Sequence, residues 1–141
     1  MSESKCIFCQ IIRRETSASI VYEDEQVAAF LSNRPVNEGH TLVVPKKHYV
    51  NIYETTEDEA AYLFKVAKRV AHAVKEATGI EAIRIVQNNG ADAGQLIFHL
   101  HVHVIPMKPP QNQARYELEL RAPEQLEKDA GKIRARLTES R

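Results

Sequence analysis

Apolar and polar residues alternate strictly between positions 98 and 104, and Ile-Pro follows. The apolar members are mostly β-branched or aromatic, and every intervening position is a histidine. A period of two over this length predicts a strand across residues 98–106. Because alternate side chains of a strand share a face, we expect His99, His101 and His103 on one face and the apolar residues in the core.

Four other segments carry the short β-branched or apolar pattern of strands, bounded by Pro, Gly, Asn or charged turns. They are residues 20–24, 26–31, 40–45 and 82–87.

One long helix is predicted after Thr56, which begins a capping box with Glu59. Apolar residues then recur at helical spacing (residues 63, 67, 70 and 74), and Gly79 is suited to end the helix. Its apolar stripe is expected to cover one face of the sheet. His72 lies on the polar side of this helix, so we interpret it as a solvated surface residue.

The two ends of the chain predict shorter helical elements. Residues 6–12 are expected to form a turn that leads into a short helix. Residues 107–113 are expected to be a linker without helix potential. A charged amphipathic helix is predicted from near Pro123, and its narrow apolar stripe is expected to rest on its own domain or on a partner subunit.

The composition is that of one globular domain: 141 residues, 43% hydrophobic and 27% charged. The formal net charge is zero, so no global field favours nucleic acid or an anionic membrane, and neither is expected as a partner. No apolar run approaches the ~20 residues of a membrane span, and no signal-peptide core is found. Both cysteines lie in one short motif, which suits a reducing compartment, so the expected location is cytoplasmic.

That motif, Cys6-x-x-Cys9, has the spacing of half a tetrahedral zinc site. The other half has to come from elsewhere in the chain, and isolated histidines are the candidates. A thioredoxin-like redox pair is one alternative, although no clear strand precedes the motif. Two packed structural cysteines are the other.

The three strand histidines cannot all bind one metal, because strand positions two apart are separated by ~6.8 Å and four apart by ~13 Å. The plainest division joins one of them to Cys6, Cys9 and His48, which follows the strand ending at Pro45. Such a closed Cys2His2 site makes zinc structural. His99 is the natural ligand, since it leaves His101 and His103 for other chemistry.

Residues 88–95 form a small-residue loop directly before the histidine strand. Its glycines let backbone amides approach an anion, which favours phosphate binding, although a plain hairpin turn would have the same composition. A neutral His101 beside such a loop is placed to attack phosphorus. Gln95 and the loop amides would then stabilise charge, and His103 would hold the phosphate or assist proton transfer to the leaving group.

Taken together, Gly94-Gln95 followed by His99-x-His101-x-His103 resembles the signature of the histidine triad (HIT) superfamily. The likeness extends to residues 29–31, to residues 39–48 and to Cys6-x-x-Cys9. It implies an α+β fold with a five-stranded antiparallel sheet in each subunit of a homodimer, where two sheets join into a ten-stranded one. The expected division of the chain is a HIT domain over residues 1–108, followed by a linker and amphipathic helix over residues 109–141.

The resemblance also implies nucleotidyl transfer to His101 from nucleoside phosphoramidates or dinucleoside polyphosphates, followed by hydrolysis to a nucleoside monophosphate. The expected substrate is a purine nucleotide with an AMP-type product. The implied nucleotide-binding residues are Phe30, Ser32, Asn33, Asn88, Gly94, Gln95, Leu96, His101 and His103. Many bacterial members carry zinc at the positions of Cys6, Cys9, His48 and His99.

Several positions depart from the family pattern. Ser32 stands where most members have an aspartate for the ribose hydroxyls, and Leu96 stands where the phosphoramidase branch has a serine. Met107-Lys108 replaces a frequent arginine. His103 favours hydrolysis, since the uridylyltransferase branch carries glutamine there.

The sequence therefore predicts a zinc-containing nucleotide hydrolase with His101, His103 and Gln95 as catalytic residues. Two alternatives stay open. One is a non-catalytic nucleotide-binding or scaffold protein. The other is a metalloenzyme in which a His-x-His pair binds the metal that activates water.

Overall fold

The computed structural model describes residues 3–109 and 118–140, with side chains through Leu137 in the last helix. A five-stranded antiparallel sheet forms its centre, in the order β1-β2-β3-β5-β4. The α+β class and the five antiparallel strands are as expected. The strands are β1 (Ile20–Glu23), β2 (Val27–Leu31), β3 (Thr41–Pro45), β4 (Ala82–Val86) and β5 (Val102–Met107).

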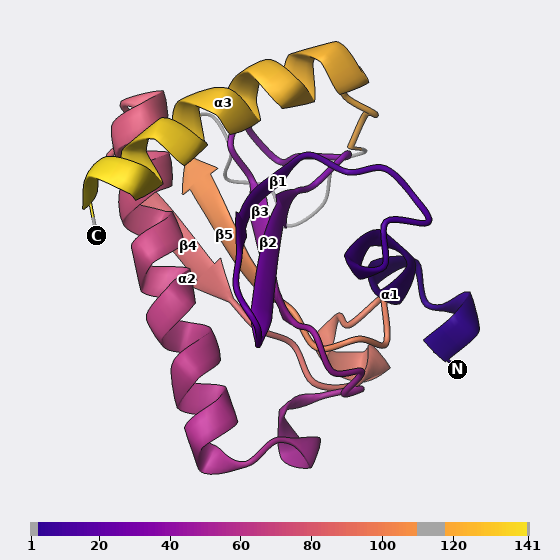
Figure 1. Cartoon of the computed structure of the whole chain (residues 1–141). Helices are drawn as coiled ribbons and strands as arrows, with labels where there is room; N and C mark the ends of the chain where they lie inside the picture. The colour runs from indigo at the N-terminus through magenta and orange to yellow at the C-terminus, as the bar shows by residue number, and fades with distance from the viewer. Residues whose placement is uncertain (1–2, 110–117, 141) are drawn as a thin grey trace.

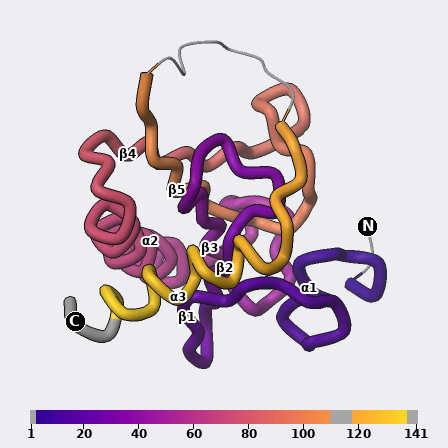
Figure 2. Tube along the Cα trace, turned by 90° about the horizontal axis from the view of Figure 1, so that it is seen from above, coloured from indigo at the N-terminus to yellow at the C-terminus, as the bar shows by residue number. Residues whose placement is uncertain are grey.

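Within the described residues, three α-helices lie around the sheet: α1 (Ile7–Ile12), α2 (Glu57–Thr78) and α3 (Pro123–Ser140). Short 3-10 turns are found at Glu3–Lys5, Ile52–Glu54 and Ala91–Ala93. Helix α2 packs along one face of the sheet, α1 lies on the opposite side, and α3 packs on α2 and β1 (Figures 1 and 2). No helix in the described parts of the chain is long and apolar enough to cross a bilayer.

Strand β2 separates two hydrophobic clusters by simple alternation. Val27, Ala29 and Leu31 contribute to the core under α2 and α3, whereas Ala28 and Phe30 pack with α1. The period of two thus places the histidine side of β5 on the α1 face, since Val102 and Val104 are buried in the α2 core.

The predicted caps of α2 are confirmed. The Thr56 side chain accepts a hydrogen bond from the Glu59 backbone, and the Glu59 side chain accepts one from the Thr56 backbone. Gly79 ends the helix in the left-handed conformation, with φ 74°.

The apolar stripe of α3 rests on the chain's own domain. Leu126, Ala130, Ile133 and Leu137 are buried in the core formed with α2 and the sheet. In addition, the Arg134 Nε donates to the Ile20 carbonyl of β1 over 2.8 Å, so α3 covers part of the β1 edge.

The histidine strand is shorter and shifted relative to the prediction of residues 98–106. Strand β5 begins at Val102, and the chain bends at residues 97–99. Upstream of His103 the partner strand β4 has ended at Val86, so this stretch lacks a ladder on that side. At its other end β5 includes Met107, which pairs with Ala82, so the predicted linker begins too early; residues 110–113 of that linker lie outside the described residues.

Candidate functional site

Four potential metal ligands converge beside α1. The two thiols of Cys6 and Cys9 and the Nδ1 atoms of His48 and His99 all lie within 4.8 Å of one another. The Cys6 Sγ is 3.4 Å from the His99 Nδ1, and the Cys9 Sγ is 3.3 Å from the His48 Nδ1 and 3.5 Å from the His99 Nδ1. Sulfur and nitrogen ligands of a tetrahedral zinc ion lie about 3.6 Å apart, given Zn–S near ~2.3 Å and Zn–N near ~2.05 Å. The four residues therefore fit a zinc ion.

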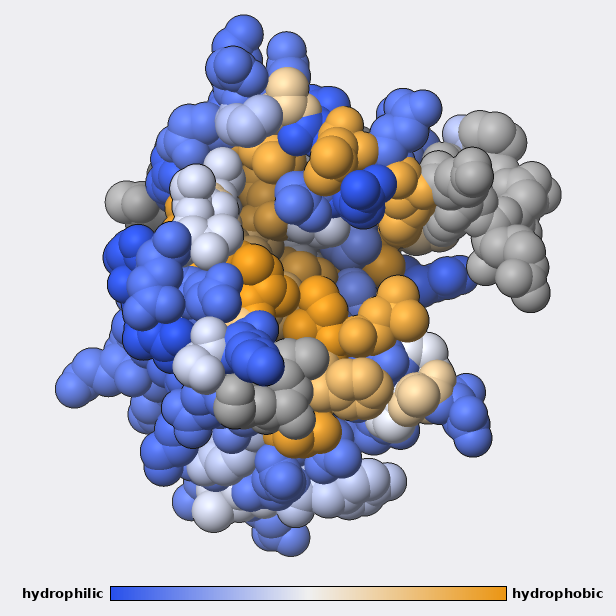
Figure 3. All heavy atoms as spheres, turned by 90° about the vertical axis from the view of Figure 1, so that its right-hand side faces the viewer, coloured by the Kyte–Doolittle hydropathy of each residue, from blue (hydrophilic) through white to orange (hydrophobic). Residues whose placement is uncertain are grey.

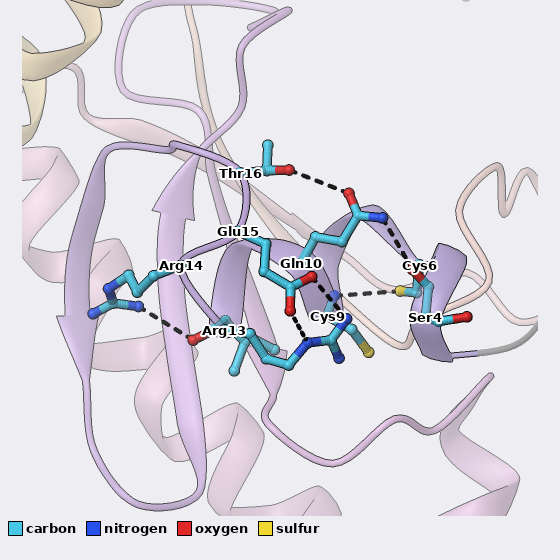
Figure 4. A network of polar contacts seen from close by, with 9 residues as sticks. Ser4, Cys6, Cys9, Gln10, Arg13, Arg14, Glu15 and Thr16 are labelled. Atoms are coloured by element: carbon cyan, nitrogen blue, oxygen red, sulfur yellow. Dashed lines mark hydrogen bonds and ion pairs between the residues drawn. The ribbon is translucent and has the colours of Figure 1, made fainter.

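The Cys-x-x-Cys motif folds so that both thiols face this cluster. Cys6 is the N-cap of α1, and its Sγ accepts a hydrogen bond from the Cys9 backbone over 3.4 Å (Figure 4). The Gln10 side chain donates to the Ser4 carbonyl and accepts from the Thr16 hydroxyl, which ties the turn to both flanking segments. The local helix thus preorganises half of the ligand set.

The histidine half is oriented by the end of β3. The His99 Nε2 donates to the Pro45 carbonyl over 2.8 Å, so its Nδ1 presents a lone pair to the thiols. Burial lowers the pKa of His99 to about 4, and burial with the Cys6 neighbour raises the pKa of Cys9 to about 11. Burial thus disfavours charge on the imidazole and on the thiol alike, and a bound cation is the group that would offset the charge of two thiolates.

His101 lies next to this cluster but outside it. Its Nδ1 donates to the His99 carbonyl over 2.7 Å, which leaves a lone pair on Nε2. Burial lowers the pKa of His101, so the neutral imidazole is favoured near pH 7. The Phe8 ring of α1 meets it edge to face, with ring centres 5.2 Å apart.

A hydrogen-bond chain fixes the proton of the third histidine. The Val36 backbone donates to the His40 Nδ1 over 3.1 Å, so the His40 proton is on Nε2. That Nε2 lies 3.1 Å from the His103 Nδ1 and donates to it. The His103 Nε2 consequently carries a proton, and the His101 and His103 rings lie 4.8 Å apart. A nitrogen with an available lone pair and a nitrogen that carries a proton thus belong to adjacent rings.

Sequence reasoning missed two members of this site. From the sequence, His40 is placed in a strand and in the family likeness of residues 39–48 but is assigned no role in the site, and none is assigned to Phe8. No local sequence signal identifies His40, because its role depends on a contact with His103, 63 residues away; in the fold it is 4% exposed, and a buried histidine is normally hydrogen-bonded. Phe8 also contacts the Phe30 and His99 rings, at 5.3 and 5.8 Å. Phe8 thereby joins the candidate metal cluster to His101.

The loop before the histidines uses its polar side chains to hold its own shape. The Gln95 Oε1 accepts from the Gly90 backbone over 2.8 Å, and its Nε2 donates to the carbonyls of Val50 and Ile97. Gln95 is 2% exposed. A direct phosphate contact from its amide would therefore require one of these bonds to open.

The other predicted residues of this loop are more open. Asn88 is half-buried and lies close to Gly94, where a Cβ atom would be 3.5 Å from the Asn88 Nδ2. Gly94 itself has φ 100°, a conformation that L side chains rarely adopt. Leu96 is 87% exposed, so the residue in the position of the family's serine points to solvent.

Phe30, Ser32 and Asn33 lie at the end of β2 and in the following loop. Phe30 is buried against α1, whereas Ser32 is half-buried and Asn33 is exposed. The loop is closed by the Ser32 backbone, which donates to the His40 carbonyl over 2.9 Å. The predicted nucleoside residues and His40 are therefore the two ends of one loop.

Apolar side chains gather near the middle of the face that carries α1 (Figure 3). Ile12, Ile20 and Ile97 pack there as partly buried residues, and Ile7 is 38% exposed. This surface adjoins Phe8 and Phe30, so it lies beside the histidines and offers an apolar wall.

Buried His40 predicts an acid-sensitive fold. Burial, with the neighbouring His103 and His101, lowers its pKa to about 3. A lowered histidine pKa means that stability is complete above the ordinary value near 6.5 and is lost as pH falls toward the folded-state value. Between pH 7 and pH 5 His40 alone is expected to cost about 2 kcal/mol.

Denaturant unfolding of wild type and His40→Asn at pH 7, 6 and 5, with zinc held constant, measures this. We expect the variant to lose about 2 kcal/mol less than wild type over this range. His72→Asn, on the exposed side of α2, is the control and should follow wild type. Parallel curves for wild type and His40→Asn would show that His40 is not the acid-sensitive group.

The fold and site define an α+β protein with a histidine cluster beside a Cys2His2 set. The HIT domain family model matches residues 13–109, and the chain belongs to this family.

Two solved structures share this architecture over most of their length, and a third relative is similar in sequence. A hypothetical histidine triad nucleotide-binding protein from Sulfolobus tokodaii is 42% identical, with a TM-score of 0.87 over 95% of this chain and 93% of that one. A Zn-bound histidine triad family protein from Mycobacterium smegmatis is 32% identical, with a TM-score of 0.85 over 98% and 96% of the two chains. Adenylylsulfatase HINT3 of Arabidopsis thaliana is 39% identical over 106 residues, which are 75% of this chain and 54% of that protein.

Proposed function

We propose that the chain is a nucleotide hydrolase that acts at the α-phosphate and uses His101 as its nucleophile. The observation that carries this proposal is the hydrogen bond from the His101 Nδ1 to the His99 carbonyl. It holds the ring in the tautomer with a lone pair on Nε2, and burial keeps that ring neutral.

The reaction proceeds in two displacements. In the first, the His101 Nε2 bonds to phosphorus and the bond from phosphorus to the leaving group breaks, while the His103 Nε2 proton is donated as a hydrogen bond to a phosphate oxygen and the leaving atom takes its proton from water. In the second, water attacks phosphorus, the phosphorus–His101 bond breaks to release the nucleoside monophosphate, and the proton lost by that water passes to the solvent. The His40 hydrogen bond keeps His103 in the tautomer that this requires.

The phosphate is held by Asn88 and the backbone near Gly94, beside His103. Gln95 acts on the reaction by holding this loop, because its side chain binds the backbone at Gly90, Val50 and Ile97. Preorganised donors of this kind stabilise charge that develops in the transition state.

The nucleoside occupies the α1 face. Phe30 lies under this face with Phe8, and Leu96 offers an exposed apolar surface at the neighbouring loop. Ser32 and Asn33 contact the ribose, with one hydroxyl and one amide in place of the family's carboxylate. The apolar wall suits a purine base.

Zinc on Cys6, Cys9, His48 and His99 is structural in this proposal. All four donors come from the protein, so the site has no open position for a water ligand. The Zn-bound relative from Mycobacterium smegmatis supports the choice of metal. When bound, the ion would hold α1 against the end of β3.

The leaving group distinguishes the candidate substrates. An amine from a nucleoside phosphoramidate, a nucleotide from a dinucleoside polyphosphate and sulfate from adenylylsulfate all leave from the α-phosphate. Adenylylsulfate is included because the chain is similar to the Arabidopsis thaliana adenylylsulfatase. The two departures at Ser32 and Leu96 favour a non-catalytic nucleotide-binding protein as the second candidate.

A substrate panel tests the proposal. Purified protein is mixed with an adenosine phosphoramidate, a diadenosine polyphosphate and adenylylsulfate, and AMP release is followed. Rapid quenching and intact mass spectrometry should detect an adenylylated protein whose modification maps to His101. Nucleotide binding without AMP release or adenylation would establish the scaffold alternative instead.

A homodimer through β4 is proposed as the assembly, and the protein is proposed to act in the cytoplasm. The two sheet edges differ, because α3 packs on β1 whereas Ile85 of β4 is 45% exposed. An open edge strand with an exposed isoleucine is suited to pair with a second copy.

Ile85→Lys is expected to shift this dimer toward monomer, because a charge would be buried at the joined edge. Sedimentation velocity at micromolar concentration measures the change. Ile7→Lys is the matched control, since Ile7 is 38% exposed and belongs to α1. A wild-type monomer, or an Ile85→Lys dimer as stable as wild type, would contradict an interface through β4.

A further inference from the structure

The loop between β2 and β3, residues 32–40, has a fixed base. The Ser32 backbone donates to the His40 carbonyl, and the His40 backbone donates to the Asn37 carbonyl. The Asn37 side chain, which is 8% exposed, donates to the Pro106 carbonyl of β5 over 2.8 Å. These bonds, within the loop and to β5, hold the His40 end of the loop against the sheet.

The Asn33 end of the same loop is bound to the segment that leads into α3. The Arg121 backbone donates to the Asn33 carbonyl over 2.9 Å. The Arg34 Nη1 donates to the Leu118 carbonyl over 3.1 Å. Two hydrogen bonds, one donated by each segment, therefore join the Asn33 end of the loop to the C-terminal segment, about 85 residues away along the chain.

The Arg121 side chain anchors that segment to α3. Its Nε and Nη2 atoms contact the two carboxylate oxygens of Asp129 at 2.7 and 3.2 Å. The Asp129 side chain is only 5% exposed, and Arg121 also lies 3.8 Å from a Glu38 oxygen in the loop. A bidentate pair of this kind fixes the direction of the guanidinium and, through it, the register of the backbone that meets Asn33.

We propose that Arg121 is a positioning residue of the nucleotide site. Held by Asp129, it fixes the Asn33 end of the 32–40 loop, so that the docking of α3 tightens nucleoside binding. The inference rests on the proposed function, which places the ribose at Ser32 and Asn33. It assigns a role to the C-terminal helix, namely to hold rigid a loop whose ribose position carries a shorter side chain than the family's aspartate.

The two ends of the loop predict a split between binding and chemistry. The His40 end has its own bonds to the sheet, so the His103 proton is unaffected when Arg121 is changed. In a variant of Arg121 the Asn33 end becomes more mobile. Nucleoside binding then has to order it, which costs conformational entropy and weakens binding. We therefore expect KM to change and kcat to stay.

Arg121→Ala tests this, with the most active substrate of the panel. We expect KM to rise about tenfold and kcat to change less than about threefold. Amide hydrogen exchange in the 32–37 segment, measured without nucleotide, should accelerate. Arg121→Lys keeps the charge beside Asp129 but lacks the two-pronged contact, so a smaller rise in KM is expected.

Arg134→Ala is the matched control, because Arg134 also ties α3 to the sheet but does so at Ile20. It should leave KM and the exchange of the 32–37 amides as in wild type. Equal effects of Arg121→Ala and Arg134→Ala on KM, or unchanged exchange in Arg121→Ala, would overturn the inference.

Two further results are decisive. If Arg121→Ala does not fold, Arg121→Lys carries the comparison, and a wild-type KM with wild-type exchange in that variant would overturn the proposal. If wild-type protein neither binds nor cleaves any nucleotide, the proposed function fails and the role in nucleoside binding fails with it. In that case the exchange experiment would separately show whether Arg121 holds the loop.

Discussion

Replacing His101 by alanine is expected to lower AMP release by at least ~10⁴-fold, since the variant lacks the nitrogen that we propose as the nucleophile. The adenylylated intermediate should also disappear. Nucleotide binding and zinc content should remain close to wild type, because His101 is not one of the four converging metal ligands. Steady-state turnover, quenched-flow mass spectrometry and nucleotide titration measure the three effects.

His103→Ala provides the informative comparison. In the proposed mechanism this variant lacks the hydrogen bond from the His103 Nε2 to the phosphate, so turnover is expected to fall by about 10²–10³-fold. His72→Ala, on the exposed surface of α2, should behave as wild type. Substantial turnover by His101→Ala, or adenylation that maps to His103, would refute the assignment of the nucleophile.

Replacing Cys9 by serine is expected to remove zinc and to lower the free energy of unfolding by several kcal/mol. The Cys9 thiol lies within 3.5 Å of the Nδ1 atoms of His48 and His99, so its loss removes the ligand that is adjacent to both imidazoles. The effect extends to catalysis through Phe8, whose ring contacts both His99 and His101. Metal analysis and denaturant unfolding measure the two changes.

Chelation of the wild-type protein separates a structural from a catalytic ion. Circular dichroism and AMP release are followed together as a chelator is added, and we expect activity to fall with the fold. Cys9→Ser is the control, because a chelator should have no further effect on it. Immediate loss of activity from a protein that keeps its structure and stability would identify a catalytic metal and would favour the metalloenzyme alternative.

Local patterns were sufficient for most of the secondary structure. The Thr56–Glu59 capping box and Gly79 set the ends of α2 by bonds between residues close in sequence. The apolar stripe of α3 likewise predicted which of its faces is buried. The prediction was wrong at β5, where alternation continues upstream of Val102 but the ladder to β4 does not. Alternation reports which side a residue faces, and only a neighbouring strand determines whether it pairs.

In the candidate site, too, some features could be predicted from local patterns and others could not. The grouping of Cys6, Cys9, His48 and His99 was predicted from ligand type and strand spacing, and the structure brings these four together. The bond from His40 to His103 was not predictable in this way, since it joins residues 63 positions apart. Gln95 was expected to face the phosphate, but its three bonds to the backbone depend on where Val50 lies.

By itself, the sequence determined most element types and the shared face of His99, His101 and His103, because these follow from side-chain identity and backbone periodicity. The tertiary structure alone decided which nitrogen of His40, His101 and His103 carries a proton, that Phe8 links the Cys2His2 set to His101, and that the segment before α3 reaches the 32–40 loop at Arg121. Those features depend on the direction of individual atoms in residues distant along the chain. Periodicity specifies a face, whereas a hydrogen bond requires the position and orientation of two particular atoms.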